Sequence, residues 1–343
     1  MRVIGRTSIH RWRHPGIAAT ASTAPSCLVD PLLELICHNL GVFLRSEAES
    51  LGYHDHAIAR AVKDGTWVRV RRGAYVLGDI YRGLDLSGRY DLLCRAAVRQ
   101  ARTDVVLSHT SSLAQWGCPL WEAPLNEVHL TRQDGRTQRR EAHVRPHRGL
   151  LIDGDIERRN GLLVTSPARA LLEYTTIADV EHSLVEVDDL LHRKLVELAA
   201  LRARYAAMSQ WPGTLITDLV LRLADGRSES VGETRARYLV WSQGLPPPEV
   251  NYPIYDENGR EVARVDLAWP ELGLFLEFDG KVKYERLLQD GERPSDVVVR
   301  EKRREDMICR LTGWRCIRIV WADLYQPAVT AAKIRAMFRS SAA

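Results

Sequence analysis

The spacing of hydrophobic and polar residues changes several times along the chain, and each change marks a predicted element. Apolar positions at helical spacing predict a short helix over 46–51 and a second helix over 54–64, with a turn at Gly52 between them. From residue 67 to residue 76, apolar and basic residues alternate, which is typical of β-structure. This order predicts a winged helix-turn-helix over residues 39–80.

The flanking segments are less regular. Residues 1–38 mix Arg, His, Ser, Thr and Pro, with an apolar patch only at their end, and are expected to form a loosely ordered arm. Residues 85–210 alternate helical and strand-like segments, which predicts a middle mixed α/β domain. This domain ends in a linker over 179–208 that is expected to be helical throughout. A domain boundary is therefore expected between residues 210 and 228.

The last segment, residues 228–338, has the pattern of a compact domain. A helix over 231–243 is followed by three prolines and by a strand near 250–255. Two more strands, a helix and a final strand complete the pattern. We expect a mixed sheet with flanking helices, and the fold class of the chain is α/β (α+β).

Composition narrows the class of protein. The 343 residues suggest two or three domains, and 45% hydrophobic residues are enough to form their cores. The net charge of +4 says little about nucleic acid, so local clusters must carry that argument. Six scattered cysteines without CxxC spacing favour neither a structural zinc site nor a disulfide framework. With no apolar run long enough to cross a bilayer, a cytoplasmic location and no membrane partner are expected.

A cluster of acidic residues gives the strongest chemical signal. Two β-rich runs, 262–269 and 274–279, flank a four-residue turn and predict an antiparallel hairpin. If Trp269 pairs with Leu274, Asp266 lies opposite Glu277. Asp279 shares the face of Glu277, so three carboxylates converge.

These three acids predict a metal site. Like charges on an apolar strand are unfavourable without a compensating cation, and carboxylate oxygens favour Mg²⁺, or Mn²⁺ in its place. The matching reaction is phosphodiester hydrolysis, in which a nearby lysine positions the nucleophile or stabilises the oxyanion. Lys281 and Lys283 are the candidate lysines. Solvation of isolated acids at a strand end is the alternative.

Two flanking segments each allow two interpretations. Ser230 and Glu233 have capping-box spacing, so Glu233 either closes a helix N-terminus or acts as an accessory catalytic acid. The charged helix over 300–306 either has a solvated face or holds DNA backbone through Lys302 and Arg304.

The predicted winged helix offers a DNA-binding surface. Its second helix would direct Ile58, Ala61 and Val62 inward, so that the polar side enters a major groove while the wing contacts phosphates. Protein interaction is the alternative role of such a module. The DNA-binding residues predicted from the helix and the wing are His54, His56, Arg60, Lys63, Arg69, Arg71 and Arg72. A second basic run, residues 132–148, is either a solvated loop or a further phosphate-facing surface.

Residues 228–338 resemble a known nuclease family. They have EFDG at 277–280 and GWR at 313–315, together with Glu233, Asp266 and the helix over 302–306. This order is similar to that of the DUF559 group, relatives of the very-short-patch-repair (Vsr-like) endonucleases in the PD-(D/E)XK superfamily. The resemblance implies a restriction-endonuclease-like fold, magnesium and DNA cleavage. The lysine slot of a strict E-x-K motif holds Asp279 here, so either Lys281, Lys283 or Lys302 supplies that function or hydrolysis is impaired.

Residues 43–195 resemble a second family. RRGAYV in the wing, SHTSSLAQWG at 108–117 and VTSPARALLEY at 164–174 are similar to AbiEi-type antitoxins of type IV abortive-infection systems. The resemblance implies a winged helix coupled to a second α/β domain, DNA binding, repression of its own operon and a cognate toxin as partner.

Three functions remain open at this point. A DNA-targeting nuclease active in phage defence is favoured by the intact acids. A non-enzymatic DNA-binding regulator is favoured by the missing lysine, and an RNA-directed nuclease is the third alternative.

Overall fold

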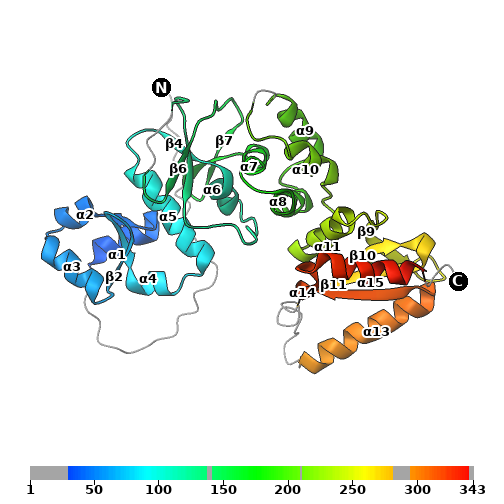
Figure 1. Ribbon diagram of the computed structural model, residues 1–343. Coiled ribbons are helices and arrows are strands. Elements are labelled where there is room, and N and C mark those ends of the chain that lie inside the picture. The colour runs from blue at the N-terminus through cyan, green and yellow to red at the C-terminus, as the bar shows by residue number, and fades with distance from the viewer. Residues whose placement is uncertain (1–29, 137–140, 209–210, 281–293, 340–343) are drawn as a thin grey trace, which may run out of the picture. The chain divides into compact units, whose positions relative to one another are not determined.

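The computed structural model describes residues 30–136, 141–208, 211–280 and 294–339. Helices and three β-sheets alternate along these residues, so the chain is an α/β protein (Figure 1). It divides into two compact units. The first contains the residues up to Gly117 and Glu122–Ala170, and the second contains Cys118–Trp121 and the residues from Leu171 onward.

A small helical domain with a three-stranded sheet begins the first unit. Its sheet has the order β1-β3-β2, and all pairings are antiparallel. The rings of Phe43, Trp67 and Tyr75 pack together at its centre. The order predicted for a winged helix-turn-helix is thereby confirmed. Its elements are α1 (Pro31–Leu40), β1 (Phe43–Leu44), α2 (Arg45–Ser50), α3 (Asp55–Lys63), β2 (Trp67–Arg71) and β3 (Ala74–Leu77).

Helix α1 corrects one expectation, because residues 31–38 were assigned to a loosely ordered arm. The Asp30 side chain accepts a hydrogen bond from the Leu32 amide at 2.8 Å and caps the helix. Leu33 and Cys37, one helical turn apart, are buried in the core that also holds Ile58 and Trp67. The apolar patch is therefore one face of a packed helix. Residues 1–29 lie outside the described part of the chain.

A five-stranded mixed sheet forms the rest of the first unit. Its order is β6-β5-β4-β8-β7, with β4 parallel to β8 and β5 parallel to β6. The middle mixed α/β domain expected from the sequence is therefore present. The elements of this part are α4 (Gly78–Arg82), α5 (Leu86–Gln100), β4 (Val105–Leu107), α6 (His109–Gln115), β5 (Val128–Arg132), β6 (Val144–His147), β7 (Ile156–Arg159), β8 (Leu162–Thr165) and α7 (Pro167–Tyr174).

The helical segment after α7 differs from the expected continuous linker. It consists of α8 (Val180–His192), α9 (Leu198–Ala206) and α10 (Thr217–Leu223). The helix stops after His192, and Lys194 adopts a left-handed conformation with φ 55°. All three helices belong to the second unit, so the division lies near residue 170 instead of between 210 and 228.

Buried polar contacts explain why α8 belongs with the carboxy-terminal unit. The Asp188 carboxylate accepts hydrogen bonds from Thr234 Oγ1 at 2.9 Å and from Arg237 at 2.5 Å, both on α11 (Val231–Ser242). Glu181 of α8 also pairs with Arg235 of α11 at 2.7 Å. These long-range pairs could not be found from local spacing.

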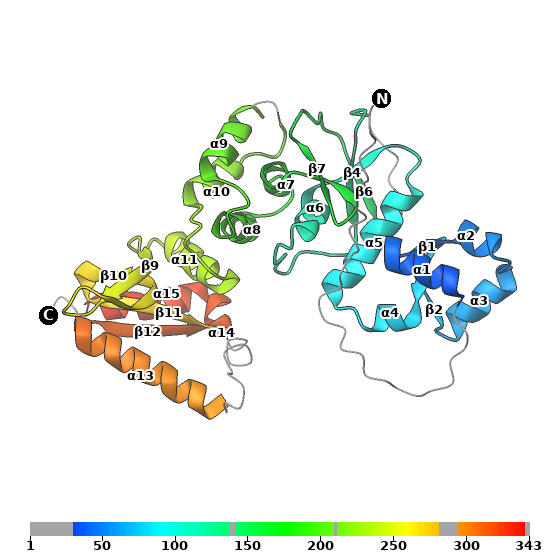
Figure 2. The same ribbon diagram turned by 180° about the vertical axis from the view of Figure 1, so that it is seen from behind.

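The carboxy-terminal sheet confirms the element order expected for residues 228–338. Its order is β12-β11-β10-β9, with β11 and β12 parallel and the other pairs antiparallel. Helices α11 and α15 lie on one side of the sheet and α13 lies on the other (Figures 1 and 2). The elements after α11 are β9 (Glu249–Tyr255), β10 (Glu261–Trp269), the short 3-10 helix η1 (Pro270–Leu272), β11 (Leu274–Asp279), α13 (Pro294–Thr312), β12 (Arg315–Val320), α14 (Trp321–Leu324) and α15 (Pro327–Arg339).

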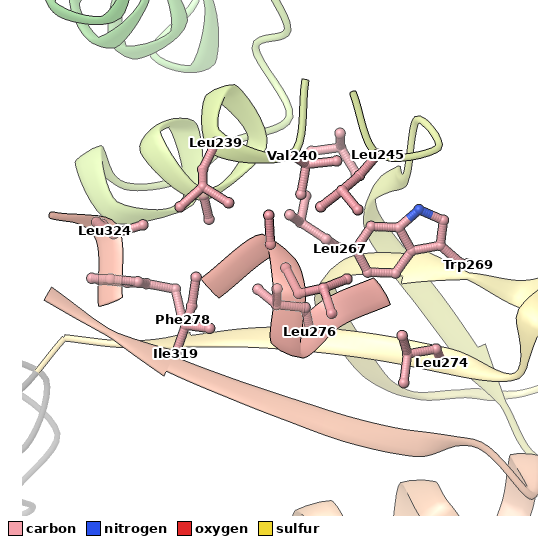
Figure 3. Close-up of a cluster of buried hydrophobic side chains, with 14 residues drawn as sticks. Leu239, Val240, Leu245, Leu267, Trp269, Leu274, Leu276, Phe278, Ile319 and Leu324 are labelled. Atoms are coloured by element: carbon pink, nitrogen blue, oxygen red, sulfur yellow. The ribbon is translucent and has the colours of Figure 1, made fainter. Parts of the chain in front are cut away.

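The apolar core between this sheet and α11 determines which side chains of β11 point toward α11. Leu274, Leu276 and Phe278 point into a cluster that also contains Leu239 of α11 (Figure 3). Helix α11 approaches β11 so closely that a Cβ built on Gly232 would lie 1.9 Å from the Phe278 ring. Side chains alternate along a strand, so the residues between these apolar positions face α13 instead.

Glu186 of α8 carries a pH-dependent contribution to the stability of the second unit. Its side chain is buried, and burial, followed by the nearby Asp189 charge, raises its pKa to about 8. Because the folded pKa exceeds the ordinary value of 4.5, the protonated folded state is favoured at low pH. This contribution is present below pH 4.5 and is lost as the pH rises toward 8.

We therefore expect Glu186→Gln to flatten the pH dependence of unfolding. Between pH 5.5 and 7.5, the free energy of unfolding of the wild type should fall relative to the variant by about 1.4 kcal/mol per pH unit. Urea unfolding curves at several pH values measure this difference. Parallel pH profiles for the two proteins would show that Glu186 does not titrate in this range.

Candidate functional site

Helix α3 presents a polar face to solvent. His54, His56, Arg60 and Lys63 are exposed, whereas Ile58 is buried, as the helical pattern predicts. Ala61 and Val62 are partly buried and pack against the core of the winged helix. The polar and apolar sides of α3 are thus the ones expected from the sequence.

The acidic groups near the start of α3 are offset by a neighbouring cation. Arg45 of α2 forms ion pairs with both Glu49 and Asp55. Negative charge at this end of α3 is therefore partly neutralised, while Arg60 and Lys63 occupy its last turn. The resulting surface suits a polyanion.

The three wing arginines have different surroundings. Arg69 and Arg72 are exposed on and beside β2, next to the turn at Gly73. Arg71 is not equivalent, because its side chain is only 10% exposed and pairs with Glu141 at 3.2 Å. Arg69 and Arg72 are accordingly the stronger candidates for phosphate contacts.

The hairpin register predicted for the acids is confirmed. Trp269 pairs with Leu274, and Leu267 pairs with Leu276, which places Asp266 and Glu277 at the next step of the ladder. Asp266 accepts a hydrogen bond from the Phe278 amide at 2.7 Å. Glu277 and Asp279 alternate with the core-facing residues of β11 and so face α13.

Two arginines compensate the charge of these acids. Glu277 accepts hydrogen bonds from Arg304 of α13 at 2.9 and 3.0 Å. Asp279 pairs with Arg318 of β12 at 3.5 Å, and Arg318 also pairs with Glu305 of α13. The sequence predicts a metal ion as the source of this compensating charge, whereas two arginine side chains supply a large part of it here.

The electrostatics of Glu277 still mark an unusual environment. Burial raises the pKa of this carboxyl, the Arg304 charge opposes the rise, and the Asp266 charge reinforces it. Asp266 is therefore close enough to Glu277 to affect its ionisation. Two carboxylates on neighbouring strands are a donor set that Mg²⁺ accepts. A bound cation would lower the pKa of Glu277 and compete with Arg304 for its oxygens.

The remaining predicted catalytic residues lie in different places. Glu233 is buried and caps its own helix: it accepts hydrogen bonds from the Glu229 amide at 2.8 Å and from Ser230 Oγ at 2.7 Å. Its capping role is thus observed, and its catalytic role stays a prediction. Lys302 is exposed on α13, two residues from Arg304, on a different side of the helix. Lys281 and Lys283 lie outside the described residues.

The basic run over residues 132–148 is only partly a loop. Arg132 ends β5 and pairs with Asp134, while Arg145 and His147 lie on β6. Residues 137–140 lie outside the described part of the chain. Arg145 and Arg148 are exposed, so these positions remain available for a phosphate-facing surface.

Sequence reasoning missed a cluster of histidines in the first unit. The ring nitrogens of His109, His129 and His147 lie within 4.8 Å of one another. Among the described residues, these three form the one cluster of three or more His, Cys, Asp or Glu side chains whose potential metal-ligand atoms lie this close together. They are about 20 positions apart on three elements, so only the sheet order reveals their proximity. The signal available in the sequence was limited to the motif over 108–117.

Two comparisons relate the chain to known proteins: a family model matches its amino-terminal part, and two relatives match 56% of its length. Residues 30–78 match the family model of a transcriptional regulator, the AbiEi antitoxin. The AbiEi resemblance is confirmed over these residues, from the start of α1 to the end of β3. The nuclease-family resemblance of residues 228–338 stays a prediction. Among the described residues, no helix is long and apolar enough to cross a bilayer.

Two relatives come from Mycobacterium tuberculosis: uncharacterized protein Rv2248 of strain H37Rv and uncharacterized protein MT2308 of strain CDC 1551. Each is 30% identical to this chain over 196 residues, which cover 56% of the chain and 69% of the relative. The chain therefore belongs to the same family as these two mycobacterial proteins, with a region matching the AbiEi antitoxin at its amino-terminal end.

Proposed function

We propose that this protein is a DNA-binding transcriptional regulator that contacts duplex DNA through α3 and the wing. The observation that carries the proposal is the match to the AbiEi regulator model over the residues that form this winged helix. A cognate toxin is the protein partner that this family relationship suggests. The other residues of the chain would then position the winged helix or bind that partner.

The shape and charge of α3 support this role. His56, Arg60 and Lys63 are spaced by four and three residues, so they share one face of the helix. The helix is short enough to lie in a major groove, where His56 can reach base edges. Arg60 and Lys63 provide contacts to phosphates, which hold the helix in register.

The double variant Arg60→Ala/Lys63→Ala tests the helix contact. We expect its affinity for duplex DNA to fall at least tenfold. Each basic side chain that contacts a phosphate releases counterions from the DNA, and the variant loses this favourable contribution. The slope of log K against log salt should become shallower by about one per residue. Fluorescence anisotropy between roughly 50 and 200 mM salt measures both quantities.

A matched control removes the same charge elsewhere. Lys194, in the turn after α8, and Arg222, on α10, are exposed in the second unit, so Lys194→Ala/Arg222→Ala should bind DNA as the wild type does. Equal losses in the two double variants would mean that only net charge matters, and α3 would not be the binding surface. Stronger binding of a matched RNA duplex would redirect the proposal to RNA.

A second candidate function is metal-dependent cleavage of DNA by the carboxy-terminal domain. The observation in its favour is the placement of Asp266 and Glu277 on neighbouring strands, with the Glu277 pKa raised by burial and by Asp266. Asp266, Glu277 and Asp279 would hold Mg²⁺ or Mn²⁺. The ion would activate water and neutralise charge at the phosphorus.

The residues around these acids have defined roles in this second proposal. Arg304 of α13 pairs with the Glu277 carboxylate, and Arg318 of β12 pairs with the Asp279 carboxylate, so each arginine would hold its acid in position for the ion. Both guanidinium groups can also donate hydrogen bonds to a phosphate oxygen once DNA is present. Lys281 and Lys283, predicted beside this strand end, remain the candidates that position the nucleophile.

A further inference from the structure

We propose that His109, His129 and His147 form a binding site for one divalent transition-metal ion, with Zn²⁺ as the best-suited ion. This site lies in the first unit and is independent of both proposed functions. It uses residues from two strands of the five-stranded sheet, β5 and β6, and from helix α6.

The sheet topology brings the three imidazoles together. His109 is the first residue of α6, directly after β4, whereas His129 lies on β5 and His147 ends β6. Strands β4, β5 and β6 are neighbours, and Thr131, two residues from His129, pairs with His147. His129 and Thr131 share a face of β5, so both histidines lie on the same side of the sheet.

The distances between the rings suit a small coordination sphere. His129 Nδ1 lies 2.9 Å from His147 Nε2, and nitrogens of all three residues lie within 4.8 Å of one another. Two histidine nitrogens bound to a tetrahedral zinc are about 3.3 Å apart, since each Zn–N bond is about 2.0 to 2.1 Å. Small ring rotations therefore convert the observed cluster into a three-histidine metal site. The rings of His109 and His147 already stack with centroids 3.6 Å apart.

Burial keeps the imidazoles in the form that binds metals. His109 and His129 are each 5% exposed. Burial, and secondarily neighbouring positive charge, lowers the pKa of His129 to about 4 and that of His147 to about 3, and it lowers the pKa of His109 well below its ordinary value. Neutral imidazole has the lone pair that a metal requires, so no proton has to be displaced at pH 7.

The surroundings of His109 indicate a fixed ligand position. His109 Nδ1 lies 3.0 Å from Ser108 Oγ, which in turn accepts a hydrogen bond from Thr131 Oγ1 at 2.9 Å. Such outer contacts orient the rings of metal-binding histidines. His109 also has φ 50°, a conformation that is strained for a residue with a side chain. A non-glycine residue held in this way indicates a constraint on its position.

The donor atoms indicate the class of ion, and the charged neighbours indicate the fourth ligand. The cluster contains nitrogen donors alone, which favours Zn²⁺ over the oxygen-preferring Mg²⁺. Arg145 and Arg169 contribute positive charge near the rings, and Glu127 contributes negative charge near His147. Glu127 and Asp155, which pairs with Arg169 at 3.0 Å, offset these two cations, and three neutral ligands leave the charge of the bound Zn²⁺ uncompensated. We therefore expect the fourth position to take water, hydroxide or a small anion.

The test uses the full chain stripped of metal with a chelator. After addition of Zn²⁺ and gel filtration, elemental analysis should find about one Zn²⁺ per chain. Titration with Co²⁺ in place of Zn²⁺ should give absorption bands of a tetrahedral nitrogen-ligated ion. His129→Gln and His147→Gln should each lower the affinity at least tenfold, whereas His143→Gln, an exposed histidine of the same stretch, should not change it.

These measurements distinguish a specific metal site from nonspecific binding of Zn²⁺ at the protein surface. Zn²⁺ removed by gel filtration, or retained equally by the His129→Gln and wild-type proteins, would overturn the proposal. If circular dichroism shows that the His129→Gln and His147→Gln proteins do not fold, the test rests on the wild-type protein alone. Bands of an octahedral, water-ligated Co²⁺, or a melting temperature that excess Zn²⁺ leaves unchanged, would then refute the site.

Discussion

Asp266→Asn is expected to reduce metal-dependent DNA cleavage by at least about 100-fold, the scale for loss of one group that stabilises charge in a transition state. The substitution preserves the size of the side chain and its hydrogen bond from the Phe278 amide, so the hairpin should remain folded. Glu277→Gln should have a similar effect, because it also removes one of the charges that would hold the ion. Cleavage of supercoiled plasmid in Mg²⁺ or Mn²⁺ measures both variants.

The matched control lies in the same hairpin. Glu271 is exposed in the turn between β10 and β11, so Glu271→Gln changes the same charge without touching the acid cluster and should cleave like the wild type. DNA affinity without divalent ions should be unchanged in all three variants, since none lies on the winged helix. Equal cleavage by Asp266→Asn and wild type would assign the activity to another site. A wild type without cleavage in either metal would contradict the nuclease proposal itself.

Arg237→Ala is expected to destabilise the second unit by about 3 to 5 kcal/mol, which is the range for breaking one partner of a buried ion pair. Asp188 is almost completely buried and depends on Arg237, Thr234 and the Asp225 amide for its hydrogen bonds. Burial raises its pKa to about 6, although the Arg237 charge opposes the rise. Without the arginine, the buried carboxylate loses the cation with which it is paired.

The pH dependence of this effect follows from the same pair. In the variant, the pKa of Asp188 rises further, so more of the carboxyl is protonated at low pH and the penalty is partly relieved. The loss of stability should thus be larger at pH 8 than at pH 5. The exposed pair of Arg222 and Asp218 is the control, because Arg222→Ala should cost less than about 1 kcal/mol. Similar urea midpoints for the two variants would contradict the role of Asp188 in joining α8 to α11.

Local patterns in the sequence were sufficient for the winged helix and for the acidic hairpin. The facing of α3 follows from its helical spacing, and the pairing of Trp269 with Leu274 follows from a short turn between two β-rich runs. These features depend on residues that are close in sequence. Short-range geometry limits such elements to a few arrangements.

Features that join distant residues were not accessible in the same way. Arg304 is 27 positions from Glu277, and no spacing rule relates them. The contact between Asp188 and Arg237 spans 49 positions, so no local pattern assigns α8 and α11 to the same compact unit. The histidine cluster required the order of the five-stranded sheet. In each case tertiary packing, not local preference, selects the partner.

Site-specific crosslinking can locate bound DNA on the winged helix. A photoreactive amino acid at position 56 of the full chain, on the exposed face of α3, should crosslink efficiently to bound duplex DNA. The same group at Leu215, which is 96% exposed in the second unit and belongs to neither proposed DNA surface, should crosslink at background level. Background crosslinking at position 56, with the protein still bound to DNA, would contradict the assignment of α3 as the DNA-contacting helix.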